Sequence, residues 1–111
     1  MSDCIFCKIV DGSIPSKKVY EDEKILAFYD LEAPVHVLVI PKEHICCADS
    51  VNEENVGNIA HIFTKIPEIT KSLGLTNGYR IVNNCGEDGC QSVKHMHFHI
   101  LGGKKLNGTM A

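Results

Sequence analysis

The spacing of apolar residues along this chain changes from segment to segment, and each change predicts a different secondary-structure element. Residues 3–12 predict one or two helical turns that a glycine ends, with Asp3 as the candidate N-cap. Residues 16–21 and 24–30 are short runs rich in β-branched and aromatic residues, which predicts a β-hairpin. Residues 33–44 contain a nearly continuous Val/Leu/Ile run between two prolines, which indicates a buried central strand.

Helical spacing is clearest after Asn52, the predicted N-cap of a long helix. Gly74 supplies its C-terminal stop, and Pro67 removes a backbone hydrogen bond and is expected to kink or split the helix. His61 is expected on the solvent-exposed side. The apolar positions that recur at helical spacing are Val56, Ile59, Ala60, Phe63, Ile66, Ile69 and Leu73.

The last third of the chain contains a strand, a polar loop and a strand of alternating pattern. Residues 78–83 follow an Asn-Gly turn signal and predict the first strand. Residues 84–93 form a glycine-bearing loop that either offers backbone N–H groups to a phosphate or is a plain hairpin connection. In residues 94–101, three histidines alternate with apolar residues at the β-strand period. The histidines are therefore expected on one face and the apolar residues on the other.

These three histidines, His95, His97 and His99, are candidates for chemistry. Half of the chain's six histidines fall within these five residues, which favours a functional face over a half-exposed edge strand. Neighbouring histidines on a strand are ~7 Å apart and the outer two ~13 Å, too far for all three to bind one ion without strong twist. His36 and His44, at the ends of the central strand, fit a structural and a functional role equally well.

Composition narrows the classes of function. A chain of 111 residues with 44% hydrophobic and 23% charged residues fits one ordinary globular domain. The net charge of -3 argues against a general nucleic-acid binder, which needs clustered Lys and Arg. Neither a signal peptide nor a membrane-spanning stretch is recognisable, so a cytoplasmic protein is expected. In a reducing compartment its six cysteines are predicted to be thiols or metal ligands.

Two chemistries compete for the histidines. A pair at positions x and x+2 of a strand suits a catalytic Zn²⁺ that activates water. Alternatively, one neutral imidazole attacks phosphorus while a neighbouring imidazolium stabilises the phosphoryl oxygens, and the loop 84–93 is placed to bind the anion. Cys4 and Cys7 form a C-x-x-C pair, for which metal binding is favoured because the βαβ context of a redox site is absent.

Motifs spread over nearly the whole chain resemble a known family. Residues 91–103, which include the alternating histidines, are similar to the signature of the histidine-triad (HIT) superfamily, in its Hint-like branch of small nucleotide-binding hydrolases. Five shorter segments have counterparts in the order that the family shows. They are residues 3–9, 14–16, 28–30, 38–44 and 78–80.

The resemblance implies a role for each histidine. His97 would be the nucleophile that attacks the α-phosphorus of a nucleotide, forming a covalent nucleotidyl-histidine that water then hydrolyses. His99 would contact phosphate oxygens, and the His95 carbonyl would accept a hydrogen bond from the His97 ring. Ser92 would lie near the leaving group, and His36 would stand behind the triad. The residues matched to nucleotide binding are Ile5, Phe6, Ile9, Phe28 and Leu31 for the base, Asp30 for the ribose, and Asn84, Gln91, Ser92 and the Val93 N–H for the phosphate.

The resemblance also implies a structural zinc ion held by Cys4, Cys7, His44 and His95, with no metal needed for catalysis. In two places the sequence departs from the family pattern. The link between Asp30 and His36 is shorter than usual, and Cys90 stands where a glycine is common. A side chain at position 90 is expected to narrow the phosphate loop or to change its backbone angles.

The order of elements indicates an α+β domain over residues 1–111, with an antiparallel sheet of about five strands, one long helix and a short N-terminal helix. Residues 104–111 are expected to be a loosely ordered tail. The resemblance implies a HIT-like fold, a homodimer, and hydrolysis of purine nucleoside 5′-phosphoramidates or adenylated compounds to an AMP-type or GMP-type monophosphate. The alternatives are a dinucleoside polyphosphate hydrolase and a non-enzymatic, nucleotide-responsive interaction module.

Overall fold

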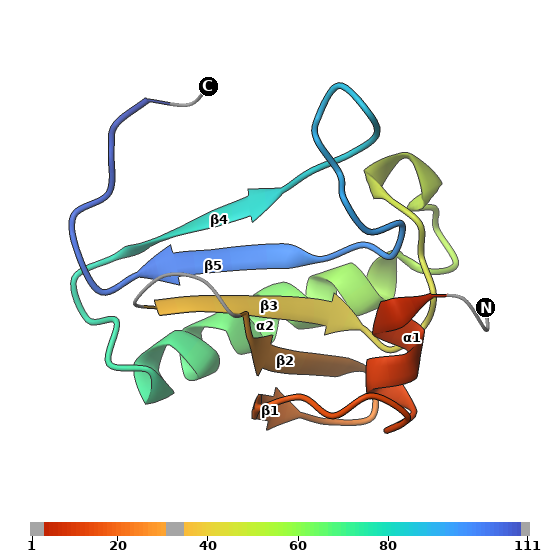
Figure 1. Cartoon of the computed structure of the whole chain (residues 1–111), viewed down its shortest axis with the longest axis horizontal. Helices are drawn as coiled ribbons and strands as arrows, with labels where there is room; N and C mark the ends of the chain where they lie inside the picture. The colour runs from red at the N-terminus through yellow and green to blue at the C-terminus, as the bar shows by residue number, and fades with distance from the viewer. Residues whose placement is uncertain (1–3, 31–34, 110–111) are drawn as a thin grey trace.

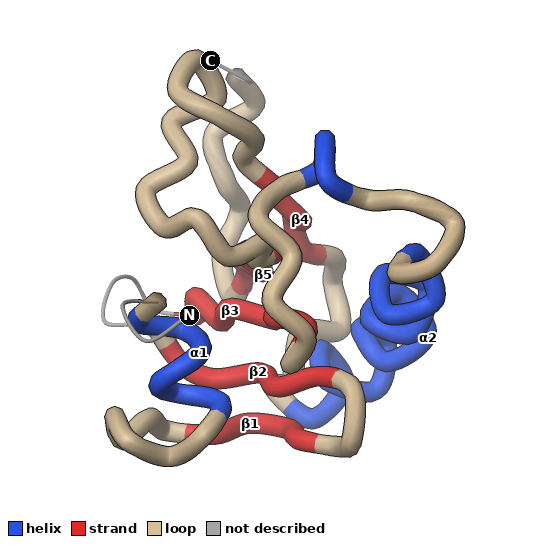
Figure 2. Tube along the Cα trace, turned by 90° about the vertical axis from the view of Figure 1, so that its right-hand side faces the viewer, coloured by secondary structure: helices blue, strands red, loops and turns tan. Residues whose placement is uncertain are grey.

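A five-stranded antiparallel sheet, in the order β1-β2-β3-β5-β4, organises the fold. The structure is a computed structural model that describes residues 4–30 and 35–109. Figure 1 shows the sheet with α1 in front of it and α2 behind it, and Figure 2 shows the same layers from the side. The expected α+β class is confirmed. The elements are α1 (Ile5–Val10), β1 (Lys18–Glu21), β2 (Ile25–Tyr29), β3 (Val35–Pro41), a 3₁₀ turn (Ala48–Ser50), α2 (Val56–Ser72), β4 (Tyr79–Asn83) and β5 (Phe98–Gly102).

The middle strand β3 is buried on both faces, as its continuous apolar run predicts. Alternate side chains enter two different cores. Val37 and Val39 pack in the core beneath α2, whereas Leu38 and Ile40 pack in the core beneath α1. The sheet therefore separates two environments, and the same strands contribute to both.

The helix α2 begins at Val56, later than the prediction that placed its N-cap at Asn52. The Asn52 side chain instead accepts hydrogen bonds from the Glu54 and Asn55 backbone N–H groups, at 2.8 and 3.0 Å, in the turn before the helix. The predicted split at Pro67 does not occur, because α2 runs through this residue. Packing on the sheet outweighs the single hydrogen bond that proline removes.

The buried side of α2 matches the predicted one in part. Ile66 and Ile69 are buried as predicted, and Ile59 and Leu73 pack against the same core. The prediction was wrong at Val56 and Phe63, which are 45% and 49% exposed, and it omitted Ile62, which is buried. The exposed Phe63 ring packs edge to face against Phe98 of β5, the strand that pairs with the edge strand β4, with ring centroids 5.5 Å apart.

The regular strand β5 begins at Phe98, although the alternation predicts a strand from Lys94. Neither β4 nor β3 pairs with residues 95–97, so other groups take up their hydrogen bonds. The Met96 N–H donates to the Ile45 carbonyl at 2.6 Å, and the Asn83 side chain donates to the His97 carbonyl at 2.8 Å. The predicted division of faces is nevertheless present: Met96, Phe98 and Ile100 lie in the core beneath α2.

The described part of the predicted C-terminal tail, residues 104–109, contains no helix or strand. The Arg80 guanidinium donates a hydrogen bond to the Asn107 carbonyl at 2.6 Å and so ties this segment to β4. Among the residues that the structure describes, no helix combines the length and apolar character needed to cross a membrane.

Candidate active site and metal centre

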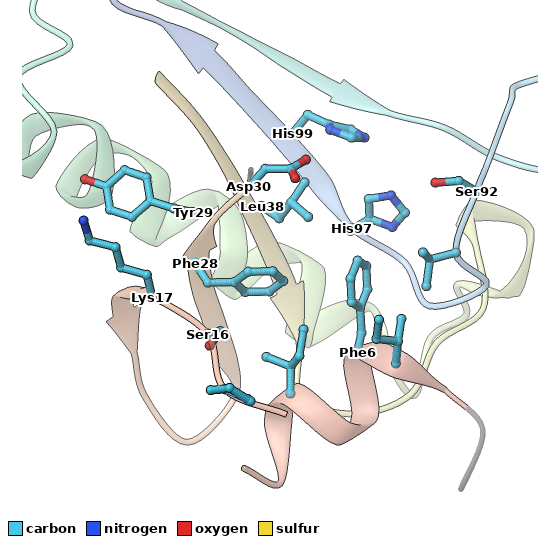
Figure 3. A pocket seen from close by; sticks show the side chains of 14 residues that line it. Phe6, Ser16, Lys17, Phe28, Tyr29, Asp30, Leu38, Ser92, His97 and His99 are labelled. Carbon is cyan, nitrogen blue, oxygen red and sulfur yellow. The ribbon is translucent and has the colours of Figure 1, made fainter. Parts of the chain in front are cut away.

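A pocket of about 740 Å³ opens on the α1 face of the sheet (Figure 3). Phe6 of α1 and Phe28 of β2 form its apolar side, with their rings edge to face and the ring centroids 5.7 Å apart. The polar side contains two imidazoles, a carboxylate and a hydroxyl. The predicted nucleotide residues that line the pocket are Ile5, Phe6, Ile9, Phe28, Asp30, Ser92, Val93, His97 and His99.

His97 is held in a single orientation at the bottom of this pocket. Its side chain is 3% exposed, and its Nδ1 lies 2.8 Å from the His95 carbonyl oxygen, the contact that the resemblance implies. Since a carbonyl only accepts, Nδ1 carries the proton and Nε2 is the unprotonated nitrogen of the neutral ring. The Phe6 ring packs edge-on against the imidazole, with centroids 5.1 Å apart. The geometry thus presents a free lone pair in a mostly apolar surrounding.

His99 lies beside His97 and is connected to two further polar groups. The His97 and His99 ring centroids are 5.1 Å apart, and His99 Nδ1 lies 2.8 Å from Nε2 of His36. The Asp30 carboxylate approaches the same His36 nitrogen at 3.6 Å. Burial, together with the neighbouring His97 and His36 rings, lowers the pKa of His99. His99 is therefore neutral over more of the physiological pH range than an exposed histidine.

The loop 84–93 is braced by the two amide side chains that were predicted to bind phosphate. Asn84 donates to the Gly89 carbonyl at 2.7 Å. Gln91 donates to the Cys46 and Val93 carbonyls at 2.7 and 3.0 Å and accepts from the Gly86 N–H at 2.9 Å. Both amides are thus engaged with backbone groups of the loop and, for Gln91, of Cys46, and neither lines the pocket, whereas Ser92 and Val93 do. Figure 3 shows the Ser92 hydroxyl and the His97 ring directed toward the same space.

Cys90 has a φ of 62°, the only non-glycine residue in the described ranges with a positive φ. This left-handed conformation is one that glycine adopts readily, and the expectation that the side chain narrows the loop or changes its backbone angles stays a prediction. The neighbouring Gly89 is required for another reason. A Cβ at this position would lie 2.5 Å from the Cys85 carbonyl oxygen.

Several pocket residues were missed by the sequence analysis. Leu38 had a usable signal, because it shares a face of β3 with His36. The Ser16 hydroxyl is buried without a hydrogen-bond partner among the described residues, and the matching segment 14–16 that contains it carried no prediction of a role in the pocket. The predicted base-pocket residue Leu31 lies outside the described residues. The missed lining residues are Pro15, Ser16, Lys17, Tyr29 and Leu38.

A second group of side chains, Cys4, Cys7, His44 and His95, meets where α1 contacts the sheet, with all four donor atoms within 4.8 Å of one another. Cys7 Sγ lies 3.2 Å from His44 Nδ1 and 3.5 Å from His95 Nδ1, and Cys4 Sγ lies 3.4 Å from His95 Nδ1. Sulfur and nitrogen ligands of a tetrahedral zinc ion are ~3.5 Å apart, given bonds of ~2.3 and ~2.05 Å. The residues therefore fit a zinc ion.

The protonation of this group supports the same fit. His95 Nε2 lies 2.8 Å from the Pro41 carbonyl oxygen, so it carries the ring proton and leaves Nδ1 free to bind metal. Burial and the adjacent Cys4 thiol raise the pKa of Cys7 to about 11, so two thiolates here require a positive ion.

Asp3, the predicted N-cap of α1, lies outside the described residues, and Cys4 occupies the N-cap position, where its sulfur accepts from the Cys7 N–H.

The sequence model of the HIT domain matches residues 11–106 of the chain. This protein belongs to the HIT family. It is 49% identical to a histidine triad protein of Clostridium difficile, with a TM-score of 0.94 and 99% of this chain and 98% of that one covered. A HIT family hydrolase of Legionella pneumophila is 41% identical, with a TM-score of 0.90 and coverages of 96% and 97%.

A maize relative described as a 14 kDa zinc-binding protein is 43% identical over 110 residues, which span 96% of this chain and 86% of that one. The predicted family and HIT fold are thus confirmed. The chain has the domain and fold of HIT family hydrolases, and its group of two cysteines and two histidines is consistent with zinc.

Proposed function

We propose that this HIT protein is a nucleotide-binding hydrolase that cleaves purine nucleoside 5′-phosphoramidates, or similar adenylated compounds, through a covalent intermediate on His97. The observation that carries the proposal is the 2.8 Å contact of His97 Nδ1 with the His95 carbonyl, which leaves Nε2 free for attack. The hydrolase named among the similar structures supports the reaction class.

The shape of the pocket suits a nucleotide lying across the sheet. The purine packs on the aromatic side, near Phe6 and Phe28, where edge-to-face rings form an apolar wall. The ribose hydroxyls bind the Asp30 carboxylate. The α-phosphate lies on the polar side, where Ser92, the Val93 N–H and His99 surround the reacting phosphorus.

The reaction has two displacements at phosphorus. In the first, His97 Nε2 attacks, the P–N bond breaks, and the amine leaves with a proton from the Ser92 hydroxyl. In the second, water attacks the nucleotidyl phosphorus, its proton returns to Ser92, and Nε2 departs as the nucleoside monophosphate is released. His99 and the loop N–H groups stabilise the phosphoryl oxygens in both transition states. These steps use residues of this chain, and we assign no metal ion to them.

We assign the zinc ion a structural role. When bound, it supplies a positive charge that holds Cys4 and Cys7 as thiolates against His44 and His95. Because α1 carries both cysteines as well as Phe6, the ion fixes the aromatic wall relative to the sheet. A closed set of four protein ligands is typical of structural zinc.

We also propose that the protein is a homodimer joined through the β4 side of the sheet. β4 is an edge strand, and its residues Tyr79 and Ile81 are 38% and 36% exposed. Val56 and Phe63 of α2 add the exposed apolar surface described above. Light scattering after size exclusion is expected to give twice the chain mass, and Ile81→Lys is expected to give a folded monomer. A monomeric wild-type protein would contradict the proposal.

The test of the proposed function measures turnover of adenosine and guanosine phosphoramidates, dinucleoside polyphosphates and adenylyl sulfate. His97→Ala is expected to lower phosphoramidate hydrolysis by at least about 10³-fold with unchanged circular dichroism. His61→Ala, a histidine change outside the pocket, serves as the control and should keep its rate within about twofold. A residual rate within a few-fold of wild type would show that His97 is not the nucleophile. Binding of AMP without turnover of any compound would instead identify a non-enzymatic module.

A further inference from the structure

A second cluster of metal-type ligands lies on the polar side of the pocket and contains no cysteine. Asp30, His36 and His99 each direct one donor atom into it, and these atoms lie within 4.8 Å of one another. Figure 3 shows the Asp30 carboxylate beside the His99 side chain at the edge of the pocket. His97 belongs to neither this cluster nor the zinc-type cluster among the described residues.

Strand pairing builds this cluster. In the β3–β5 register, Leu38 lies opposite His99 and His36 lies two residues away on the same face of the sheet. Asp30 directly follows β2, and its N–H donates to the His36 carbonyl at 3.0 Å. The three side chains therefore come from neighbouring strands whose positions the sheet fixes.

The distances are close to those that a metal ion needs. His36 Nε2 lies 2.8 Å from His99 Nδ1 and 3.6 Å from Asp30 Oδ2. Ligand atoms of a tetrahedral zinc ion are ~3.3 Å apart, given bonds of ~2.05 Å. The first of these separations is ~0.5 Å shorter and the second ~0.3 Å longer than a zinc ion requires, and small side-chain rotations supply both changes.

The exposed fractions of the His36 and Asp30 side chains also suit an ion that enters from the pocket. The His36 side chain is 11% exposed and the Asp30 side chain 30%, so one ligand is enclosed and another faces the opening. Three protein ligands leave a fourth position free on the pocket side. Two imidazoles and one carboxylate are ligands that divalent first-row transition metals accept.

We propose that Asp30, His36 and His99 form a second metal site, which binds a divalent ion of the zinc class and keeps one coordination position open to the pocket. Binding needs a lone pair on both His36 Nε2 and His99 Nδ1, so the hydrogen that lies between these two atoms moves to the other nitrogen of its own ring and no net proton is released. An ion here occupies the Asp30 carboxylate, so it competes with a nucleotide. This competition rests on the proposed function, whereas the site itself does not.

Cobalt titration of the protein already loaded with one zinc ion per chain tests the site. One further equivalent of Co²⁺ is expected, with cobalt d–d absorption and without thiolate-to-cobalt charge transfer. His36→Gln is expected to lose this equivalent and to retain the zinc. The control His61→Gln changes the other histidine that contacts an aspartate, Asp22, and is expected to bind the second equivalent like wild type.

Three results would overturn the site: no second equivalent, a second equivalent that His36→Gln retains, or thiolate charge transfer that assigns the ion to the remaining cysteines. A competition experiment with AMP then separates the site from the proposed function. Mutual exclusion of AMP and Co²⁺ supports both, and AMP affinity unchanged by Co²⁺ contradicts the competition. Absence of AMP binding to the cobalt-free protein rejects the nucleotide proposal, and the cobalt titration then decides the metal site by itself.

Discussion

The two faces of the sheet use alternate residues of the same strands but bury different chemistry. Beneath α2, Phe98 and Ile100 meet aliphatic side chains of the helix. Beneath α1, His95 and His97 are 0% and 3% exposed, yet each ring has a backbone carbonyl as hydrogen-bond partner. Burial of a polar group is unfavourable without such a partner. The α1 face therefore depends on specific contacts, whereas the α2 face depends on packing.

The two helices also differ in how much of their stability comes from packing on the sheet. α2 has 17 residues and α1 has 6, of which only Phe6 and Ile9 are buried. An isolated helix of one or two turns is unstable, so α1 needs a tertiary tether. In the structural role proposed for zinc, the N-cap residue Cys4 and Cys7 of α1 would supply that tether. Stability and function should consequently respond differently to changes on the two faces.

The largest expected effect comes from removing the tether on the α1 face. Cys7→Ser should lower the free energy of unfolding by roughly 4 kcal/mol or more, because metal binding contributes directly to folding. Thermal denaturation with zinc stoichiometry measures this loss. Cys85→Ser, a half-buried thiol outside the cluster, is the control and should change stability little. If chelation abolished turnover while the melting temperature stayed constant, the zinc would be catalytic.

The aliphatic face should respond through packing alone. Ile66→Ala removes a side chain that is 2% exposed beneath α2 and should lower the free energy of unfolding by about 3 kcal/mol, whereas Ile66→Val should lower it by about 1 kcal/mol. Urea unfolding gives both values. At a temperature where each variant is folded, kcat/KM is expected within about twofold of wild type. A large loss of kcat/KM at full folding would show that the two faces are not independent.

The sequence predicted the parts of the fold that depend on local pattern. The alternation around His97 assigned residues to faces correctly, because a strand's period follows from its backbone. It did not predict that β5 begins only at Phe98, since that depends on which residues of β3 and β4 pair with it. Nor did it predict the use of Gln91 as a loop brace, because the Cys46 carbonyl that it binds is distant in sequence.

His61 also makes a contact with a residue distant in sequence that the local pattern did not predict. It was expected in solvent, but its Nε2 lies 2.7 Å from Asp22 Oδ2, in the turn between β1 and β2. Burial acts to raise the pKa of Asp22, but hydrogen bonds from His61, the Lys24 N–H and the Tyr20 hydroxyl outweigh it and hold that pKa well below its usual range.

This carboxylate predicts an acid-dependent stability. Since the folded pKa lies below the unfolded value of 3.8, the contribution of Asp22 is complete at higher pH and is lost as the pH falls through the folded pKa. Asp22→Asn should lower the free energy of unfolding by about 1–2 kcal/mol at pH 7, and the difference from wild type should shrink between about pH 5 and pH 2. The control is Glu23→Gln, an exposed neighbour. A difference that stays constant with pH would contradict the ionic contribution of Asp22.

The smallest expected effect concerns the loop that borders the pocket on the α1 face. Cys90 holds a φ of 62°, which costs a residue with a Cβ about 1 kcal/mol and glycine almost nothing. Cys90→Gly should therefore raise the free energy of unfolding by up to about 1 kcal/mol, reduced by the greater entropy of glycine in the unfolded chain. Gly86→Ala is the matched opposite change, because Gly86 has a φ of 74°, and it should lower stability by about 1 kcal/mol. If Cys90→Gly instead lowered the stability, the Cys90 side chain would have to make a contact that stabilises the fold by more than its backbone strain costs. The conformation of the loop 84–93 would then depend on that thiol.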